Sequence, residues 1–340
     1  MEDIRLFGRL GHLSDEQASA LVDFKILLSD KQLFSPEVII DEKRSIPATH
    51  EDAYLLKFLR AGRFNLTAAF RQFETTEKWR KNGAVDQIYD TFDVKEFEET
   101  RKYYPQWTGR RDKNGVPIQV YEVGALDSRK MNLFYQSAKS GAKSTKSSLP
   151  ATTQRLIVIA EHSTNFVVPL CSSVQKRTNP EVPIETTVNI VDITGLGFTQ
   201  FWALRNHLKD ASTLAQSYYP EALEKVFVIG APSGFTKIWD WAKGWFDAAT
   251  TSKIFFLTPE NITATLKEHI DLDNIPKKYG GNLDWKLGDA PDLDEELRAL
   301  LADAGSNETP FALGTLHWKV SDGKKSVVLS GTENGKRRYL

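Results

Sequence analysis

The chain has 340 residues, of which 41% are hydrophobic, and its formal net charge is −1. This length suits one large domain or two of ordinary size, and so small a net charge gives no broad attraction to nucleic acid. The single cysteine, Cys171, excludes an internal disulfide and a cysteine-based zinc site, and we expect it to be a small buried side chain in a reducing compartment.

No stretch of the chain has the composition of a membrane segment. Such a helix needs roughly 20 consecutive apolar residues, and the longest apolar runs, such as 226–231, have the length of a strand. The first residues, MEDIRLFGRLGHLSDEQ, lack the apolar core of a signal peptide. We therefore expect a soluble cytoplasmic protein whose membrane contact is peripheral and reversible.

The first part of the chain is predicted to be helical. Ser14 and Gln17 have the spacing of a capping box at a helix start, and Gly83 is placed to end the last helix of this part. Helices are predicted over 15–29, 52–60 and 66–81, with a loop over 34–50 that contains two prolines. We assign residues 1–95 to a small helical N-terminal module.

Strands and helices alternate after that module. A basic, polar stretch at 138–150 predicts a loop. The strands are predicted at 117–121, 188–193, 226–231 and 254–257, and the helices at 154–171, 201–217, 236–246 and 259–269. Because such alternation is typical of a parallel sheet covered by helices, we assign 96–285 to one α/β domain. Residues 286–340 are then a C-terminal extension, first acidic with a short helix at 294–302, then weakly strand-like.

The helix at 236–246 has an unusual apolar stripe. Its members recur with helical spacing and are Ile238, Trp241, Ala242, Trp245 and Phe246. Three tryptophans lie within seven residues, interleaved with Lys237 and Lys243. An ordinary helix that faces the core is one interpretation. The density of tryptophan and lysine favours a helix that meets lipid.

The predicted sheet carries no recognisable catalytic or nucleotide-binding motif. The segment DITGLG at 192–197 follows a strand, but position 200 is Gln, so the third glycine of a dinucleotide-binding loop is missing. No Walker sequence and no Gly-x-Ser-x-Gly elbow occur. The six histidines are scattered without metal-ligand spacing, so we expect no metal site. The pattern favours a carrier over an enzyme.

Four groups of motifs resemble a known family in their order and spacing. They are LLKFLRAGRFN with FETTEKWRKNG (55–65 and 73–83), YYPQWTGRRDKNGVPI (103–118), DITGLG with SYYPEALEKVFVIGAPSGF (192–197 and 217–235), and FDAATTSKI with IPKKYGGNL (246–254 and 275–283). Over roughly residues 50–285 the chain resembles the CRAL-TRIO lipid carriers, and within them the Sec-fourteen type of phosphatidylinositol transfer protein. The resemblance implies a helical N-terminal module followed by a mostly parallel sheet whose covering helices enclose an apolar pocket for one lipid.

The resemblance also implies roles for individual residues. The helix at 236–246 falls at the place of the family's gate, so its apolar stripe is expected to line the acyl pocket and the gate. The phosphatidylinositol head group is expected to meet Thr250, Lys253, Glu221 and Arg63. In the family, Arg63 corresponds to the second of two consecutive basic residues. This chain has Gly62 at the position of the first.

The positions that hold phosphatidylcholine in the family differ in this chain. Thr187 keeps one of the two strand hydroxyls, whereas Asn189 replaces the other. The family's tyrosine positions correspond to Thr108, Gln119 and His162. Because choline recognition relies on aromatic faces around a quaternary ammonium, these residues favour a second ligand other than phosphatidylcholine. His162 has two further interpretations, a satisfied core residue or a pocket ligand, including a ligand of haem iron.

We therefore expect a monomeric carrier that exchanges phosphatidylinositol and a second hydrophobic ligand at membrane surfaces, with no cofactor beyond the bound phospholipid. Two alternatives stay open. One is a lipid-sensing interaction protein, which presents lipid to a partner enzyme through the basic loop at 138–146 and the C-terminal extension. The other is a haem-binding relative, although we expect no haem.

Overall fold

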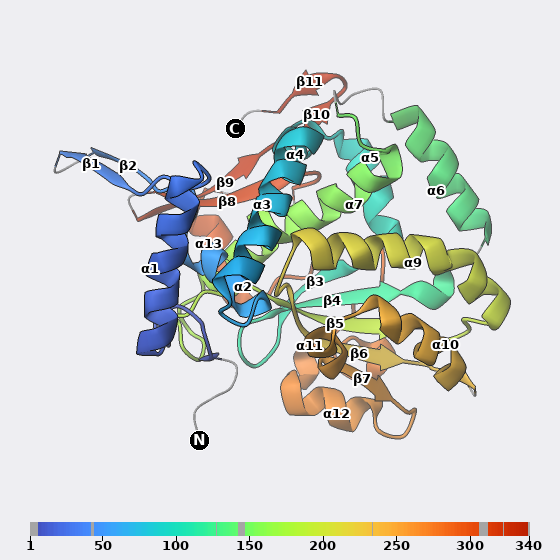
Figure 1. Cartoon of the computed structure of the whole chain (residues 1–340). Coiled ribbons are helices and arrows are strands. Elements are labelled where there is room, and N and C mark those ends of the chain that lie inside the picture. Colours follow the sequence, from blue (N-terminus) through green and yellow to red (C-terminus); the bar gives the residue numbers. More distant parts are fainter. Residues whose placement is uncertain are drawn as a thin grey trace. The chain divides into compact units, whose positions relative to one another are not determined.

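The computed structural model describes residues 6–41, 44–126, 128–141, 147–232, 234–305, 312–321 and 323–338. The chain forms two compact units (Figure 1). The first comprises residues 1–82, 181–183 and 215–221, and the second comprises 83–180, 184–214 and 222–340.

The first unit is built around three helices: α1 (Asp15–Asp30), α2 (Asp52–Ala61) and α3 (Leu66–Gly83). Ser14 and Gln17 form the predicted capping box at the start of α1. The buried rings of Phe24, Phe58 and Phe73 hold the helices together, since Phe73 packs edge-to-face on the other two at 5.9 and 5.0 Å.

The predicted loop at 34–50 is partly wrong, because it contains a hairpin of β1 (Val38–Asp41) and β2 (Arg44–Ile46). Every described residue of the two strands is exposed. A strand that buries neither face shows no alternation of polar and apolar residues, so the pattern in the sequence missed it.

The second unit contains the predicted α/β sheet. Its five strands are β3 (Gln106–Arg111), β4 (Pro117–Glu122), β5 (Thr187–Asp192), β6 (Leu223–Ile229) and β7 (Ile254–Leu257), in that spatial order. β4 to β7 pair in parallel, and β3 adds to β4 in the antiparallel sense. The mostly parallel sheet is thus confirmed. β3 went unpredicted because QWTGRR is polar and contains a glycine.

The two faces of this sheet have different coverings (Figure 1). Ile118, Val188 and Phe227 are fully buried on one face and belong to the same core as Leu266 of α12. The opposite face is covered by α7, α9 and α10. The helices of this unit are α4 (Val85–Thr91), α5 (Val94–Thr100), α6 (Ser128–Gly141), α7 (Ala151–His162), α8 (Val168–Ser172), α9 (Phe198–Tyr218), α10 (Phe235–Ala242), α11 (Ala248–Ser252), α12 (Ile262–His269) and α13 (Glu295–Asp303).

Three predicted segments differ from the structure. The helix at 154–171 is α7 and α8 joined by a π-helical segment at 163–167, and Pro169 lies at the start of α8, where its missing N–H costs least. Part of the predicted loop at 138–150 is helical, because α6 continues to Gly141, whereas 142–146 lie outside the described residues. The helix at 236–246 is α10 followed by a 3₁₀ turn, Lys243–Trp245, around Gly244.

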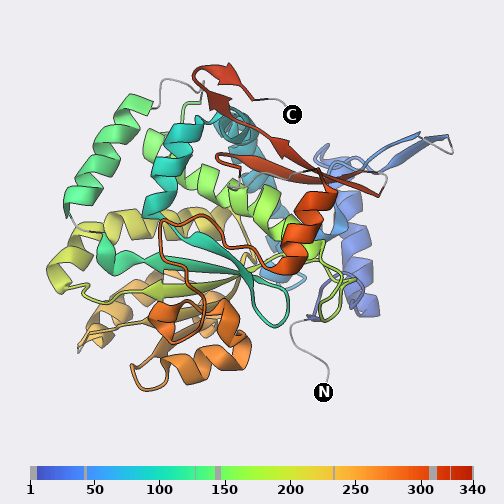
Figure 2. The same cartoon turned by 180° about the vertical axis from the view of Figure 1, so that it is seen from behind.

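The C-terminal residues pack into the second unit. They form α13 and the strands β8 (Leu316–Ser321), β9 (Lys324–Leu329), β10 (Thr332–Glu333) and β11 (Lys336–Arg337), drawn in orange and red in Figure 2. Leu297, Leu316 and Trp318 share a core with Trp107 of β3 and Phe166. Buried apolar side chains therefore fix this part of the chain to the sheet.

Two consecutive arginines of β3 bind acidic residues just before α13 and in its first turn. Arg110 contacts Asp292 at 2.6 Å, and Arg111 contacts Asp294 and Glu296, both at 2.8 Å. The side chain of Arg111 is only 10% exposed, so these charge-assisted bonds are shielded from solvent. The acidic composition of the extension thus has a structural use.

A substitution at Gly109 tests the attachment of the C-terminal segment to β3. Its φ is +88°, and a Cβ there would lie 2.4 Å from the backbone carbonyl carbon of Asp292. We expect Gly109→Ala to lower the free energy of unfolding by at least about 2 kcal/mol, from the left-handed backbone and the clash together. Urea unfolding measures this loss.

Gly195→Ala is the matched control. Its φ is +80°, but nothing lies within 4 Å of the added Cβ, so only the backbone cost of about 1 kcal/mol applies. Equal losses in the two variants would contradict close packing of the C-terminal segment on β3.

Candidate functional site

The predicted gate helix, α10, covers the sheet face that also carries α9. Ile238 and Ala242 are 6% and 8% exposed and pack in one apolar cluster with Phe201 and Leu204 of α9 and Val228 of β6. The inner part of the predicted stripe is therefore closed over the sheet. Trp245 and Phe246 are partly buried, whereas Trp241 is 42% exposed.

Aromatic side chains continue from α10 onto the outer surface of α9. Trp241 contacts Trp245 and Trp202, with ring centroids 4.7 and 5.7 Å apart, and Trp202 stacks on Phe198 at 6.1 Å. Phe198 and Trp202 are 66% and 47% exposed. We call Phe198, Trp202 and Trp241 the aromatic surface. The sequence reading missed its α9 half, although the spacing of Phe198 and Trp202 places them on one helix face.

Thr250 and Lys253, the expected head-group residues of the second unit, are close together. Asp247 caps α11 by accepting a bond from the Thr250 N–H at 2.6 Å, and Lys253 ends the helix. The Lys253 ammonium donates to the carbonyl of Leu223 at 2.9 Å. Both side chains are partly exposed at the point where α11 leads into β7.

Arg63 and Glu221 belong to the first unit. Both have a left-handed backbone, with φ of +51° and +55°, and Arg63 is exposed. A Cβ at the preceding Gly62 would lie 2.9 Å from the backbone nitrogen of Ala69, so this turn accommodates a glycine better than a basic side chain. Their head-group role stays a prediction.

Four of the five expected second-ligand residues lie on the gate-helix side of the sheet or beside it. Gln119 and Asn189 are partners across β4 and β5, and the Asn189 amide donates to the Thr187 hydroxyl at 2.9 Å. The Gln119 amide donates to the hydroxyl of Ser163, next to His162, at 3.4 Å. Thr108 is not part of this group, because it is fully buried and donates to the carbonyl of Ile118.

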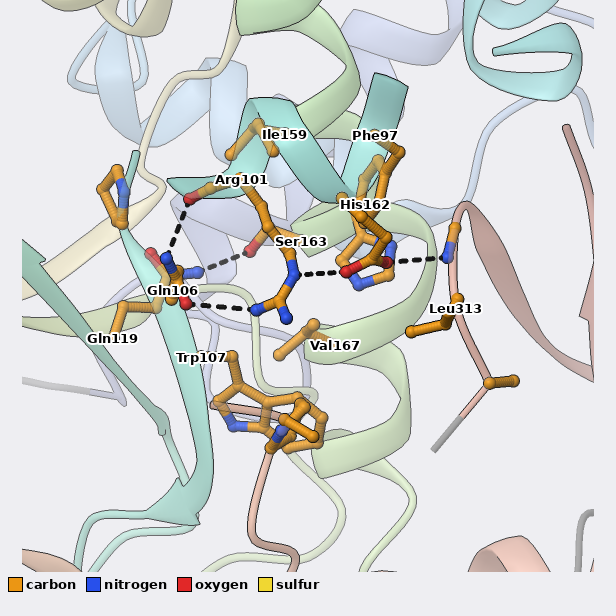
Figure 3. A pocket seen from close by; sticks show the side chains of 16 residues that line it. Phe97, Arg101, Gln106, Trp107, Gln119, Ile159, His162, Ser163, Val167 and Leu313 are labelled. Carbon is orange, nitrogen blue, oxygen red and sulfur yellow. Dashed lines mark hydrogen bonds and ion pairs between the residues drawn. The ribbon is translucent and has the colours of Figure 1, made fainter. Parts of the chain in front are cut away.

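A cavity of about 80 Å³ lies between β3, β4, α5 and α7 (Figure 3). Gln119, Ser163 and His162 line it together with Trp107, and residues 290–291 and 312–314 close it from the C-terminal segment. The sequence analysis predicted Gln119 and His162 as contacts of the second ligand. It gave no sign that the extension would form a wall, because that contact joins residues far apart in the chain.

An ion pair forms the polar wall of the cavity. The Arg101 guanidinium donates to Glu98 at 2.5 Å and to the Gln106 amide oxygen at 3.1 Å (Figure 3). The other carboxylate oxygen of Glu98 accepts from the Gly314 N–H at 3.0 Å. The charges are thus paired within the wall. Sequence spacing alone did not single out this group.

Hydrogen bonds fix the tautomer of His162. The Tyr89 hydroxyl donates its one proton to the carbonyl of Leu316 at 2.6 Å and accepts from the Leu316 N–H at 3.1 Å. Its remaining contact, 3.2 Å to His162 Nδ1, requires a proton on that nitrogen. His162 Nε2 therefore carries a lone pair. Burial, followed by the charges of Arg101 and His317, lowers the pKa of His162 to about 3, so the ring is neutral.

Other site chemistry is limited in the described part of the chain. Within the ranges given above, no group of three or more His, Cys, Asp or Glu side chains is arranged to hold a metal ion. Cys171 is buried and free, as expected. Among the described helices, none is long and apolar enough to cross a membrane.

The depressed pKa of His162 makes stability depend on pH. The pKa of an unfolded histidine is about 6.5, whereas the pKa of His162 in the folded chain is about 3. Between these values the unfolded chain holds more protons, so stability falls as the pH falls. Between pH 7 and pH 5, we expect the free energy of unfolding of His162→Phe to fall by roughly 1–2 kcal/mol less than that of the wild type. Urea unfolding at both pH values measures this difference.

His207→Phe provides a parallel test, since burial lowers the pKa of His207 to about 4. It should flatten the pH dependence by a similar amount. A slope in His162→Phe identical to that of the wild type would show that His162 titrates normally in the folded chain.

The fold agrees with comparisons to known proteins. The family model of the CRAL/TRIO domain matches residues 101–281. The Sec14 cytosolic factor of Schizosaccharomyces pombe is 33% identical over 85% of this chain and 92% of its own length. A phosphatidylinositol/phosphatidylcholine transfer protein of Arabidopsis thaliana is 30% identical over 73% of this chain and 42% of its own length.

A solved structure is similar in fold. The crystal structure of Sfh5 matches with a TM-score of 0.50 and 18% identity, covering 72% of this chain and 78% of that one. The match of the family model and the extent of the curated relatives settle the classification, and the chain belongs to the CRAL/TRIO domain family.

Proposed function

We propose that this protein carries phosphatidylinositol and a second hydrophobic ligand between membranes as a cytoplasmic monomer, without changing either ligand covalently. The names of its relatives, a Sec14 cytosolic factor and a phosphatidylinositol/phosphatidylcholine transfer protein, support this proposal. The observation that carries it is α10, which buries Ile238 and Ala242 over the sheet and exposes Trp241 outward.

The size of the hydrophobic effect explains why a carrier needs such a helix. A diacyl phospholipid has on the order of 30 methylenes, each costing about 0.8 kcal/mol in water, or ~25 kcal/mol in total. Head-group contacts of a few kcal/mol do not offset that cost. The acyl chains must therefore pass from the bilayer to the protein without becoming wet. In the proposal, α10 moves away from the sheet at the membrane surface, and the acyl chains replace its inner side chains against the sheet.

The aromatic surface supports transient membrane contact. Tryptophan combines an apolar body with one N–H donor, which suits the boundary between head groups and acyl chains. Arg205 lies over the Trp202 ring at 4.3 Å and supplies a cation for anionic head groups beside the apolar side chains. Because Trp241 belongs to α10 and contacts Trp202, insertion of this surface acts directly on the gate.

Thr250 and Lys253 are the proposed head-group residues of the second unit. An ammonium suits a phosphate because it is a compact charge with three donors. The Leu223 carbonyl holds the Lys253 Nζ beside the start of β6, and Thr250 adds a hydroxyl one turn earlier on α11. The exchange of one apolar environment for another is nearly balanced, so these polar contacts decide which lipid stays bound.

Lys253→Ala should lower the rate of phosphatidylinositol transfer about tenfold or more, because a lost charge-assisted bond costs about 1.5–3 kcal/mol. The rate is measured with radiolabelled phosphatidylinositol moving from donor to acceptor vesicles. Lys319→Ala, which removes an exposed lysine of β8, is the control and should leave transfer unchanged. Normal transfer by a folded Lys253→Ala protein would rule out this residue as the phosphate ligand.

Trp202→Asp and Trp241→Asp should each weaken binding to anionic vesicles about tenfold, since each removes one apolar side chain of about 1.5–3 kcal/mol from the contact and adds a negative charge. Vesicle co-sedimentation provides the measurement. Ile39→Asp on β1 is the control, because that side chain is 77% exposed but lies outside the aromatic surface. A uniform effect of all three substitutions would show that the aromatic surface has no special role.

A further inference from the structure

One polar atom at the cavity beneath α7 is left without a partner. His162 Nδ1 is used by Tyr89, and no described residue donates to His162 Nε2. The ring contacts those of Phe97 and Phe166, with centroids 5.0 and 5.5 Å away, and these contacts restrict its orientation. The cavity therefore presents a preoriented, neutral hydrogen-bond acceptor (Figure 3).

The charged groups of the same cavity satisfy one another. Arg101 is held by Glu98, by Gln106 and by the carbonyl of Asp289 at 3.3 Å. Glu98 is the only acid among the described residues that line the cavity, and both of its oxygens are occupied, by Arg101 and by the Gly314 N–H. A ligand thus meets no unpaired carboxylate and gains most by supplying a donor to His162.

We propose that this cavity receives the polar end of a neutral lipid that carries a hydroxyl group, which donates to His162 Nε2. This inference rests on the proposed carrier function and names the chemical class of its second ligand. Gln119 and Ser163, already joined to each other, provide further polar atoms beside that hydroxyl.

The volume of the cavity suits a small polar end. It measures about 80 Å³, roughly half of the 150 Å³ cavity that holds a benzene ring. A hydroxyl and the first carbons of a lipid fit this space, whereas a phosphocholine group is much larger. The apolar side chains of Phe97, Trp107 and Val167 surround those carbons.

Apolar side chains lead from the cavity toward the gate helix. Ile159 of α7 lines the cavity and also packs against the apolar cluster that contains Ile238 and Ala242 of α10. In the proposal, the hydrocarbon passes Ile159 and displaces apolar side chains of this cluster to reach the region that α10 covers. One movement of the gate helix exposes the path for this lipid and for a phospholipid.

Electrostatics argues against a quaternary ammonium in the cavity. The Arg101 charge acts on the ring of His162 and opposes its protonation, and it opposes any other cation placed beside that ring in the same way. A neutral hydroxyl carries no such cost, and its bond to an otherwise unpaired acceptor removes a desolvation penalty.

The experiment compares two ligands that differ only in their donor. Vesicles that carry radiolabelled hexadecanol or its methyl ether are mixed with the protein, the vesicles are removed, and the lipid retained by the protein is counted. The ether has the same chain but lacks the hydroxyl proton. We expect about three- to tenfold more alcohol than ether on the wild type, the value of one hydrogen bond.

His162→Phe keeps a ring of similar size and removes the acceptor, so the preference should disappear. His207→Phe is the matched control: it removes another buried histidine, one that packs on Tyr104 and Phe134 and does not line the cavity. It should keep the preference. If His162→Phe does not fold, the comparison of alcohol and ether on the wild type still decides the question.

Parallel vesicles with cholesterol, with dioleoylglycerol and with phosphatidylcholine distinguish the natural source of the hydroxyl. If the wild type retains more cholesterol or dioleoylglycerol than phosphatidylcholine, and His162→Phe does not, the result supports the inference and identifies the source of the hydroxyl. Equal retention of alcohol and ether by a protein that still transfers phosphatidylinositol overturns this inference alone. A wild-type protein that neither transfers phosphatidylinositol nor retains any of these lipids overturns the proposed function itself.

Discussion

The central sheet of the second unit depends on a difference between its two faces. Side chains alternate across each strand, so Ile118, Val188 and Phe227 form a fully apolar face under α12. The opposite face carries Gln119 and Asn189 beside apolar residues such as Val228. The first face is a permanent core. The second face is covered by the apolar side of α10 and contains a few polar side chains. This composition is expected of a ligand site.

The C-terminal segment is part of this arrangement. Arg110 and Arg111 hold its acidic stretch against β3, and Leu316 and Trp318 join the core beside Trp107. The same attachment brings Gly314 to Glu98 and the backbone of Leu316 to Tyr89. The segment therefore adds a hydrogen bond to the charged wall of the cavity and fixes the tautomer of His162, although it lies beyond the matched domain at 101–281.

The gate and the cavity divide the work of recognition in the proposed carrier. The aromatic surface recognises the membrane through shape and polarity that many lipids share. Lys253 offers charge to a phosphate, whereas His162 Nε2 offers a lone pair to a donor. Two head groups of opposite hydrogen-bonding character thus have separate sites in one unit. Competition between them for the apolar region under α10 gives a physical basis for exchange.

The sequence by itself determined the elements whose signals are local. The capping box at Ser14, the alternation of strands and helices, and the apolar stripe of α10 all follow from spacing within a few residues. The motifs at 55–65 through 275–283 also identified the family that the comparisons establish. β3 and the hairpin at 38–46 were missed because one is polar and the other exposed.

Only the tertiary structure decided the chemistry of His162. Its neutrality depends on burial and on the charges of Arg101 and His317. Its free lone pair depends on Tyr89 and on the backbone of Leu316, which lies 227 positions from Tyr89 in the chain. The ion pair between Glu98 and Arg101 joins residues three positions apart, whereas the hydrogen bond from the Gly314 N–H to Glu98 joins distant parts of the chain. Sequence patterns report periodicity along the chain, whereas protonation and hydrogen-bond satisfaction depend on neighbours brought together by folding.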